Sequence, residues 1–392
     1  MEQPNTSEQA VLPLEGILVA DFSRVLAGPL ATMTLADLGA RVIKVERPGS
    51  GDDTRNWGPP FSATGSTYFE SVNRNKESLC LDLGDAGDRK LARELALRAD
   101  VVVENFKAGA MARLGMGYEE LSADNPSLVY ASISGFGSAG GAGLPGYDFV
   151  VQAMGGLMSI TGAADGEAMK AGVALVDVLT AKDAAIGILA ALRSRSVHGR
   201  GALLEVNLLS SLQGALANQA QAFLGTGTVP GRLGNVHPSI APYQLLRCAD
   251  GPLAVACGND SQFAAFCRVL GLPGLAAEPR FAGNPERVRN RGELVLLLEQ
   301  ALADAPAALW QERLTAAGVP AGRVAGIDEG LEFAESLGLE PTIEVHDSTG
   351  AAVGRQVRHP VSWTPPLPPR TQAPPSLGEH DAPLREWLSG KS

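Results

Sequence analysis

One aspartate stands in a stretch of sequence that carries no other charge. Asp177 lies in the run 173–179, Val-Ala-Leu-Val-Asp-Val-Leu, just before a helix predicted over 181–194. A carboxylate in apolar surroundings is costly unless it is hydrogen-bonded or functional, and such a group can attack an acyl carbonyl as a covalent nucleophile. The alternative is a helix N-cap, a position that Asp fills well. Asp183, beside Lys182, is predicted to lie on a solvated helix face.

A second group of candidates is basic and falls at predicted strand ends or in loops. Guanidinium and ammonium groups at the carboxyl ends of strands can bind phosphates. The alternative for any one of them is ordinary surface charge. The group comprises Arg47, Arg55, Arg74, Lys76 and Arg113.

A dinucleotide site is the third chemistry to weigh, because Glu46 ends a predicted strand–helix–strand unit. The turn after the first strand, 23–29, lacks the G-x-G-x-x-G pattern that lets a backbone approach a pyrophosphate. The run 137–143 has the glycines but opens no obvious helix. Nicotinamide binding is therefore not expected.

Metal and serine-hydrolase chemistry find little support in the pattern. The histidines include no H-x-x-x-H pair and the cysteines no C-x-x-C pair, so no metal is expected. No G-x-S-x-G turn is present for a serine nucleophile. The cysteines are predicted to be reduced core thiols. These residues are His198, His237, His346, His359, His380, Cys80, Cys248, Cys257 and Cys267.

The elements that must position these residues alternate between strands and helices in the first half of the chain. A strand over 16–22, a helix over 30–38 and a strand over 41–46 form a βαβ unit, which implies a parallel sheet. The same rhythm continues, so we expect a doubly wound α/β domain. The further strands are predicted over 100–104, 128–134 and 203–207, and the further helices over 91–99 and 181–194.

The texture changes near 225–242, where Gly, Pro, Asn and His predict a linker or an active-site loop. A smaller α/β stretch follows. The Pro-rich segment 360–375 cannot form regular structure. The elements predicted beyond the linker are a strand over 253–257 and helices over 262–270, 289–303, 307–317 and 382–388.

Composition sets the class of protein. The 392 residues, 45% hydrophobic and 19% charged, are typical of a globular chain of roughly two or three domains. A net charge of −11 disfavours nucleic acid as the main partner. The N-terminal residues lack the features of a secretory signal, and no apolar run approaches the ~20 residues that span a bilayer. We expect no membrane partner and a cytoplasmic location.

Several of these stretches together resemble the class III CoA-transferase family, the formyl-CoA transferase-like proteins. The opening 14–23 with 27–29, and the segment 38–52 with Thr54 and Arg55, are similar to the family's first two strands and loops. The order and spacing of the motifs carry the resemblance over about residues 12–390. Further matching motifs lie at 73–76, 104–107, 113–115, 146–148, 177–189 and 258–260.

The resemblance implies an enzyme that moves coenzyme A from an acyl-CoA donor to a carboxylic acid. Asp177, and not Asp183, matches the family's catalytic aspartate. Its carboxylate would pass through a mixed anhydride to an aspartyl-CoA thioester, so coenzyme A is a substrate and no prosthetic group, ATP or metal is needed. Water must be excluded from these intermediates. The segment 231–238 is the candidate lid and 137–143 a second wall.

For coenzyme A itself, the resemblance points to residues in several loops. Arg47 and Arg113 could bind phosphates, Phe106 could contact the adenine, and residues 24–27 would line the pantetheine path. The full expected set is Arg24, Val25, Leu26, Ala27, Arg47, Arg74, Lys76, Asn105, Phe106, Arg113 and Tyr147.

The acyl group is predicted from departures within the family. Leu26 stands where formyl-CoA transferases have a glutamine that can hydrogen-bond an acyl oxyanion, and 231–238 lacks their run of glycines. The stretches 236–244 and 258–263 resemble members that use succinyl-CoA and dicarboxylic acids. We therefore expect succinyl-CoA as donor and a dicarboxylic acceptor, whose distal carboxylate Arg24 or His237 could hold.

Two other functions are compatible with these residues. The α-methylacyl-CoA racemase branch needs a second acid/base, and it has Gly-His-Asp where this chain has Gly146-Tyr147-Asp148. Tyrosine is a poor general base at neutral pH. A coenzyme A-binding protein without catalysis is the second alternative, and the retention of Asp177 argues against it.

The resemblance also implies an architecture. We expect a Rossmann-like large domain over 1–224 that is completed by 331–392. A small α/β domain with its linker would occupy 225–330. Two chains would form an interlocked homodimer, for which the Pro-rich tail would suit a long excursion around the partner.

Overall fold

The computed structural model describes residues 11–390, which divide into two compact units. Two segments that the sequence predicts as parts of the large domain, 158–169 and 331–339, lie in unit 2. Unit 1 comprises residues 11–157, 170–227 and 340–390, and unit 2 comprises residues 158–169 and 228–339.

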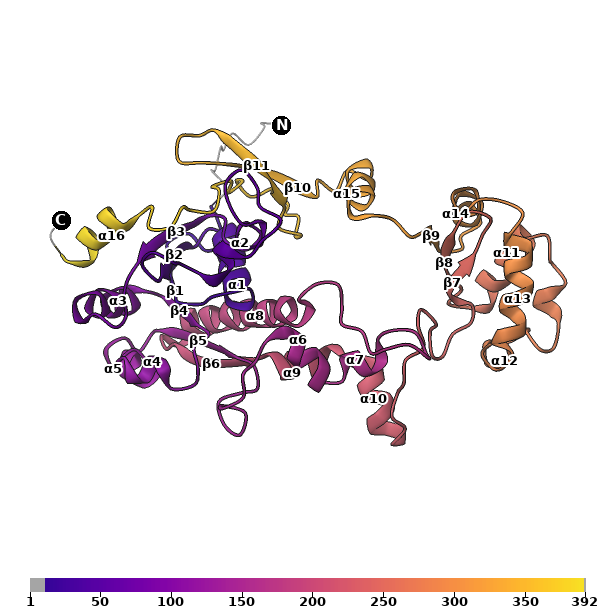
Figure 1. Cartoon of the computed structure of the whole chain (residues 1–392), viewed down its shortest axis with the longest axis horizontal. Helices are drawn as coiled ribbons and strands as arrows, with labels where there is room; N and C mark the ends of the chain where they lie inside the picture. Colours follow the sequence, from indigo (N-terminus) through magenta and orange to yellow (C-terminus); the bar gives the residue numbers. More distant parts are fainter. Residues whose placement is uncertain (1–10, 391–392) are drawn as a thin grey trace, which may run out of the picture. The chain divides into compact units, whose positions relative to one another are not determined.

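Unit 1 is built on a six-stranded sheet with the strand order β3-β2-β1-β4-β5-β6, in which every neighbouring pair is parallel (Figure 1). The predicted mixed α/β fold with a central parallel sheet is therefore confirmed. The strands are β1 (Leu18–Asp21), β2 (Arg41–Glu46), β3 (Lys76–Cys80), β4 (Val101–Glu104), β5 (Val129–Ser134) and β6 (Ala202–Asn207).

Helices cover both faces of this sheet, because the strands are apolar on both sides. In β4, Val101 and Val103 pack with α1 and α8, whereas Val102 between them packs with α3. The helices are α1 (Ala27–Asp37), α2 (Thr67–Glu70), α3 (Ala86–Arg98), α4 (Ala110–Arg113), α5 (Tyr118–Asp124), α6 (Asp148–Met154), α7 (Leu157–Ile160, at the boundary with unit 2), α8 (Leu175–His198), α9 (Leu208–Ala215), α10 (Ala217–Thr226) and α16 (Asp381–Leu388), with a 3-10 turn at Asp53–Asn56.

The edge strand β3 was not predicted, and residues far along the chain cover it. The Cys80 N–H donates to the Asp381 carboxylate at 2.6 Å, and the Ser78 N–H donates to Nδ1 of His380 at 3.2 Å. Arg385 on α16 donates to the Cys80 carbonyl at 2.7 Å. These bonds satisfy backbone groups that an open sheet edge would leave unpaired.

Between β3 and α16 in the sequence, unit 1 also contains an antiparallel hairpin of β10 (Thr342–His346) and β11 (Ala352–Val357). The Pro-rich segment 360–375 follows the hairpin and forms no helix or strand, as predicted. A single isolated bridge joins His346 to Gln372 within it.

Unit 2 contains a three-stranded antiparallel sheet in the order β7-β8-β9, packed with helices around Phe263, Phe266, Leu298 and Trp310. The predicted strand and three helices of this region are all present within a few residues of the expected bounds. Its elements are β7 (Tyr243–Arg247), β8 (Pro252–Ala256), α11 (Asp260–Val269), a 3-10 turn at Leu275–Ala277, α12 (Asn284–Arg289), α13 (Arg291–Leu302), α14 (Ala307–Ala316), β9 (Ala321–Arg323) and α15 (Ile327–Ser336).

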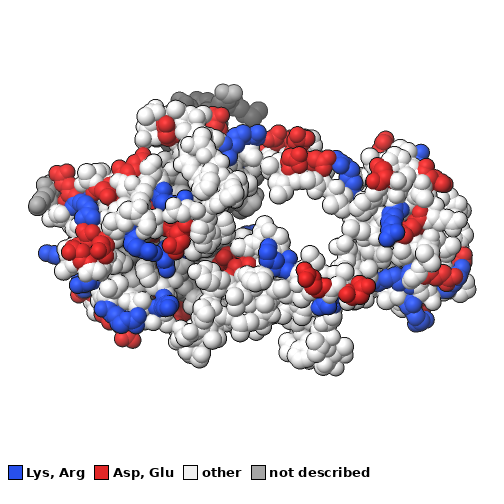
Figure 2. Space-filling view, in the orientation of Figure 1, with Lys and Arg blue, Asp and Glu red and all other residues white. Residues whose placement is uncertain are grey.

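The surface carries charges of both signs. On the face shown in Figure 2, Lys and Arg side chains lie interspersed with Asp and Glu side chains. Ion pairs at the surface of unit 1 include Arg93–Asp124 and Arg98–Glu94. Among residues 11–390, no helix combines the length and the apolar character needed to cross a membrane.

Candidate active site

Asp177 lies inside the first turn of α8 and is partly buried. The helix begins at Leu175, two residues earlier than Asp177 and six earlier than predicted, with Ala174 at the N-cap position. The N-cap interpretation of Asp177 is therefore wrong. Asp183 is exposed on the same helix, as expected.

The carboxylate that caps α8 comes from another helix. Asp148, the first residue of α6, is 9% exposed, and its Oδ1 accepts hydrogen bonds from the backbone N–H groups of Val176 at 2.7 Å and Asp177 at 3.1 Å. These are two of the N–H groups that an isolated helix leaves without partners. The two carboxylates thus lie together at one helix N-terminus.

Gln152, one turn further along α6, holds Asp148 in place. Its Nε2 donates to Oδ2 of Asp148 at 2.6 Å, and its Oε1 accepts from the Ala171 N–H at 2.8 Å. Gln152 is fully buried. Both oxygens of Asp148 therefore have hydrogen-bond partners.

The surroundings make Asp177 an unusually basic carboxylate. Burial raises the pKa of Asp177, and the negative charge of Asp148 raises it further, to about 7. Near neutral pH a large fraction of Asp177 is then ionised and able to act as a nucleophile, although the charged form is held at a free-energy cost.

Tyr68, a half-buried residue of α2, lies within electrostatic reach of the same pair. Burial, followed by the charges of Asp177, Asp148 and Asp52, raises the pKa of Tyr68 to about 12. Its hydroxyl stays protonated at neutral pH and can donate a hydrogen bond. Sequence reasoning missed Tyr68, because nothing in the polar stretch around it marks this tyrosine.

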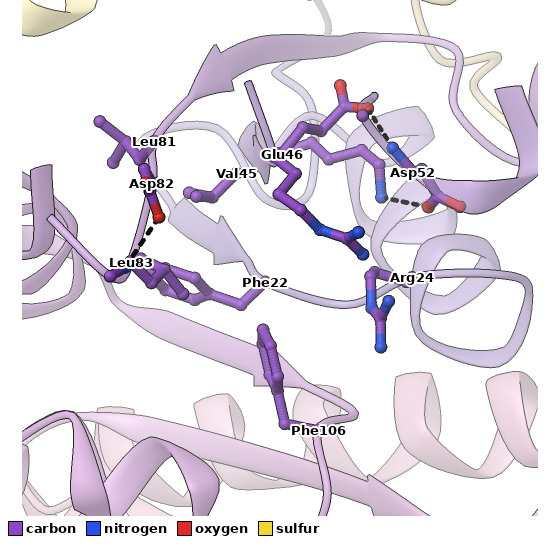
Figure 3. Close-up of a pocket in the computed structure, with 13 residues that line it drawn as sticks. Phe22, Arg24, Val45, Glu46, Asp52, Leu81, Asp82, Leu83 and Phe106 are labelled. Carbon is purple, nitrogen blue, oxygen red and sulfur yellow. Dashed lines mark hydrogen bonds and ion pairs between the residues drawn. The ribbon is translucent and has the colours of Figure 1, made fainter. Parts of the chain in front are cut away.

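A cavity of about 280 Å³ opens at the carboxyl ends of β1, β2, β3 and β4 (Figure 3). In sheets of this order, ligands bind at the carboxyl edge where the strand order reverses, here between β1 and β4. The lining residues lie in the last part of β2 or in the loops that follow the four strands: Phe22, Arg24, Lys44, Val45, Glu46, Arg47, Gly51, Asp52, Leu81, Asp82, Leu83, Gly84 and Phe106.

Two arginines, Arg24 and Arg47, and two aromatic rings, Phe22 and Phe106, line this cavity. Figure 3 shows Arg24 and Phe106 extending toward the same space, with the Arg24 guanidinium 5.7 Å from the centre of the Phe106 ring. Asp53 pairs with Arg24 at 3.0 Å and with Arg47 at 3.7 Å. Both guanidiniums remain partly exposed, so anionic groups can reach them.

The loop after β1 is held in a strained shape beside the cavity. Val25 has φ of +70°, which is unfavourable for a β-branched residue, and both oxygens of Asp52 accept from its N–H at 3.3 Å. The Asn105 side chain accepts from the Arg24 N–H at 2.9 Å and donates to the Arg24 carbonyl at 2.7 Å. Leu26 and Ala27 are buried at the start of α1.

A set of ion pairs that we call the charge cluster lies partly in the cavity lining, to which Lys44, Glu46 and Asp52 belong. Its pairs are Asp21–Lys76, Asp52–Lys44 and Glu46–Arg55. Lys76 and Lys44 are fully buried, and their distances to the carboxylates are 3.1 and 2.9 Å. Although burial alone would raise the pKa of Asp21, Lys76, Lys44 and two hydroxyl donors lower it to about 2.

Two of the residues predicted to contact coenzyme A, Lys76 and Arg74, form ion pairs within the chain. Lys76 is fully buried in β3, where its ammonium donates to Asp21, to Asn73 and to the Pro29 carbonyl. Arg74 is 4% exposed and forms a two-pronged contact with Asp37. Their charges are used within the chain, so we retain no phosphate-binding role for either.

The remaining predicted residues lie outside the cavity lining. Arg113 and Tyr147 are exposed, at the end of α4 and directly before Asp148. The segment 137–143 is a largely exposed loop of unit 1, whereas 231–238 belongs to unit 2. Within residues 11–390, no group of His, Cys, Asp and Glu side chains is arranged to hold a metal ion.

Known proteins resemble this chain over nearly its whole length. The sequence model of the family described as CoA-transferase family III matches residues 14–381. A succinyl-CoA:glutarate CoA-transferase from Mus musculus is 41% identical over 386 residues, which cover 96% of this chain and 87% of the relative. An acetyl-CoA:oxalate CoA-transferase from Acetobacter aceti is 44% identical over 332 residues, 84% of each chain. The crystal structure of a CAIB/BAIF family protein from Brucella suis superposes with a TM-score of 0.85 at 41% identity, covering 96% of this chain and 99% of that one.

Proposed function

The chain belongs to CoA-transferase family III, and from that premise we propose that it moves coenzyme A from succinyl-CoA to a dicarboxylic acid through a covalent intermediate on Asp177. The observation that carries the proposal is the position of Asp177. It is a partly buried carboxylate with a pKa of about 7, in the same unit as a cavity that presents two arginines. A carboxylate of this kind is a competent nucleophile toward a thioester.

The dicarboxylic acceptor is supported by the relatives. The mouse relative is named for succinyl-CoA and glutarate, and the Acetobacter relative for acetyl-CoA and oxalate. Glutarate and oxalate are both dicarboxylic acids. The choice of succinyl-CoA as donor follows the mouse relative and the resemblance of 236–244 and 258–263 to members that use it.

The reaction conserves charge and needs no external proton. A carboxylate oxygen of Asp177 attacks the thioester carbonyl, the C–S bond breaks, and a mixed anhydride and CoA thiolate form. The thiolate then attacks the aspartyl carbonyl, the anhydride C–O bond breaks, and succinate leaves. The acceptor acid repeats these steps in reverse and leaves as its coenzyme A thioester. Tyr68, whose hydroxyl is protonated at neutral pH and whose pKa responds to the charge of Asp177, is the proposed hydrogen-bond donor for this chemistry.

We assign the nucleotide end of coenzyme A to the cavity at the strand ends. Arg24 and Arg47 would contact phosphates there, and Phe106 would contact the adenine. Val25, Leu26 and Ala27 shape the neighbouring loop, which Asn105 holds by its two hydrogen bonds. Arg113 and Tyr147 are exposed outside the cavity lining, and we keep both as proposed coenzyme A contacts.

The finer architecture is also part of the proposal. The order β3-β2-β1-β4-β5-β6 is the strand order of Rossmann domains, which supports a Rossmann-like unit 1 with unit 2 as the small domain. An interlocked homodimer is supported by exposed apolar side chains on α10 and α15, among them Leu224, Ile327 and Phe333. Four unpaired cysteines agree with a reducing, cytoplasmic location.

Intact-protein mass after mixing with succinyl-CoA tests the central claim. The native chain should gain a coenzyme A adduct that hydroxylamine removes, and Asp177→Ala should gain none. Asp183→Ala, on the same helix, is the matched control and should behave as the native chain. An adduct on Asp177→Ala, or none on the native chain with succinyl-, acetyl-, oxalyl- or formyl-CoA, would contradict the proposal.

Coenzyme A affinity tests the assignment of the cavity. Arg47→Ala should weaken binding by about ten-fold or more, because it removes a charge-assisted contact with phosphate. Arg93→Ala removes a surface arginine of α3 and should leave binding unchanged. Equal affinities of Arg47→Ala and the native chain in calorimetry would place the nucleotide elsewhere.

A further inference from the structure

Asp148 has no role in the steps above, yet its side chain accepts hydrogen bonds from the backbone N–H groups of Asp177 and of Val176 beside it. We propose that Asp148 is a positioning residue that fixes the first turn of α8 and holds a second negative charge against Asp177, so that forming the aspartyl-CoA thioester relieves the repulsion. This inference rests on the proposed function, because it assumes that coenzyme A becomes attached to Asp177.

The geometry leaves Asp148 little freedom to move away. One of its oxygens accepts from the Val176 and Asp177 N–H groups, and the other accepts from Gln152 at 2.6 Å. Gln152 is fully buried and is itself tied to the Ala171 backbone at 2.8 Å. The carboxylate of Asp148 is therefore held by three hydrogen bonds at the first turn of α8.

Within residues 11–390, the groups that face Asp177 offer it no compensating positive charge. Its pKa is raised by burial and by Asp148, and α2 contributes the neutral Tyr68. Of the other elements packed on α8, α9 has no charged residue, α1 has only Asp37 at its far end, β5 contributes Tyr130 and β6 contributes Glu205. On α8 itself, Lys182 and Asp183 are exposed.

The repulsion between the two carboxylates favours formation of the aspartyl-CoA thioester, because that step removes the charge of Asp177. Before transfer, the negative charge resides on Asp177 beside Asp148. After transfer, Asp177 is a neutral thioester and the charge has left on the free carboxylic acid, where water solvates it. Whatever disfavours ionised Asp177 therefore favours the covalent enzyme by the same factor, and a pKa unit corresponds to about ten-fold.

The test is the equilibrium constant for the covalent adduct in Asp148→Asn. Enzyme is equilibrated with fixed ratios of succinyl-CoA to succinate at pH 8.5, and intact mass gives the fraction carrying coenzyme A. The amide oxygen of the introduced asparagine can still cap α8, while the charge is removed. We expect the constant to fall by about ten-fold, and the acid limb of the first half-reaction to move about one unit toward lower pH.

A double variant separates the charge from the hydrogen bonds. In Asp148→Asn with Gln152→Glu, the new amide can donate to the new carboxylate, which can also accept from the Ala171 N–H. The network is restored with the charge one side chain further from Asp177. Its constant should lie between those of the native chain and of the single variant. Asp183→Asn removes a charge from the exposed face of α8 and should change neither readout.

Each outcome decides the matter. A lowered constant together with a shifted acid limb supports the proposal, whereas slower turnover with both readouts unchanged would reduce Asp148 to a structural cap and overturn it. If the single variant does not fold, the double variant decides, with a constant below the native value in favour and an unchanged constant against. A native enzyme that forms no adduct at all would instead overturn the proposed function.

Discussion

Two sets of carboxylates in unit 1 differ in the charges that surround them, and the pKa values of Asp21 and Asp177 shift in opposite directions. In the charge cluster, each of Asp21, Asp52 and Glu46 faces a lysine or an arginine, and the pKa of Asp21 falls to about 2. At the start of α8, Asp148 accepts a hydrogen bond from the Asp177 backbone N–H, and burial together with the negative charge of Asp148 raises the pKa of Asp177 to about 7. The ionised carboxylate is thus stabilised in the charge cluster and destabilised at Asp177.

The difference indicates that the charge cluster has a structural role, whereas the Asp148–Asp177 pair has a role in the reaction. The charge cluster fixes the loop after β1, beside the cavity, because Asp52 binds both Lys44 and the N–H of the strained Val25. The Asp148–Asp177 pair carries a free-energy cost that chemistry on Asp177 can release. A buried carboxylate is therefore informative about function only once its partner is known.

Removing a cation from the charge cluster should have the largest effect on stability. Lys76→Met leaves Asp21 buried without its partner and should lower the free energy of unfolding by about 3–5 kcal/mol at pH 7. Urea unfolding measures this change. The control Lys90→Met, on the exposed face of α3, should cost less than about 0.5 kcal/mol. Similar losses in both variants would remove the contrast on which the comparison rests.

Removing the charge of Asp177 should have the opposite sign. Because its pKa is raised from 3.8 to about 7, the ionised form destabilises the folded chain above pH 7. Asp177→Asn should therefore gain up to about 4 kcal/mol in free energy of unfolding at pH 8. The gain should shrink as pH falls through 7 and vanish below about pH 4. A variant that is less stable than the native chain at pH 8 would contradict this prediction.

The smallest effect should come from a surface pair. Arg93→Ala breaks the contact with Asp124, in which both side chains are more than a third exposed. The free energy of unfolding should change by less than about 1 kcal/mol and respond weakly to added salt. A cost comparable to that of Lys76→Met would mean that burial does not set the scale of these charges.

The sequence predicts the parts of the fold that repeat an apolar pattern. The strands β1, β2, β4, β5 and β6 and the long helices were found this way, because their side chains are buried on regular faces. It does not predict β3, whose first residues Lys76 and Glu77 are charged. Lys76 is buried only because Asp21, 55 residues earlier, lies inside the fold, and local pattern cannot show such a partner.

The site follows the same rule. Asp177 could be singled out because it is the one charge in an apolar run. Asp148 was visible as part of the 146–148 motif, but its contact with Asp177 joins residues 29 positions apart and needed the structure. Tyr68 could not be singled out, because its burial and the three carboxylates that raise its pKa depend on segments distant in the sequence.

Residues 380–385 cover the edge strand β3, and this arrangement has a consequence for the synthesis of the protein. The bond from Cys80 to Asp381 links residues 301 positions apart. At about 5–20 residues per second, a ribosome needs roughly 15–60 s to make the intervening chain. During that interval the nascent sheet presents an uncovered edge strand, which is a template for association with neighbouring chains. Synthesis of this protein should therefore depend on chaperones, and slow translation of its last third should lower its soluble yield.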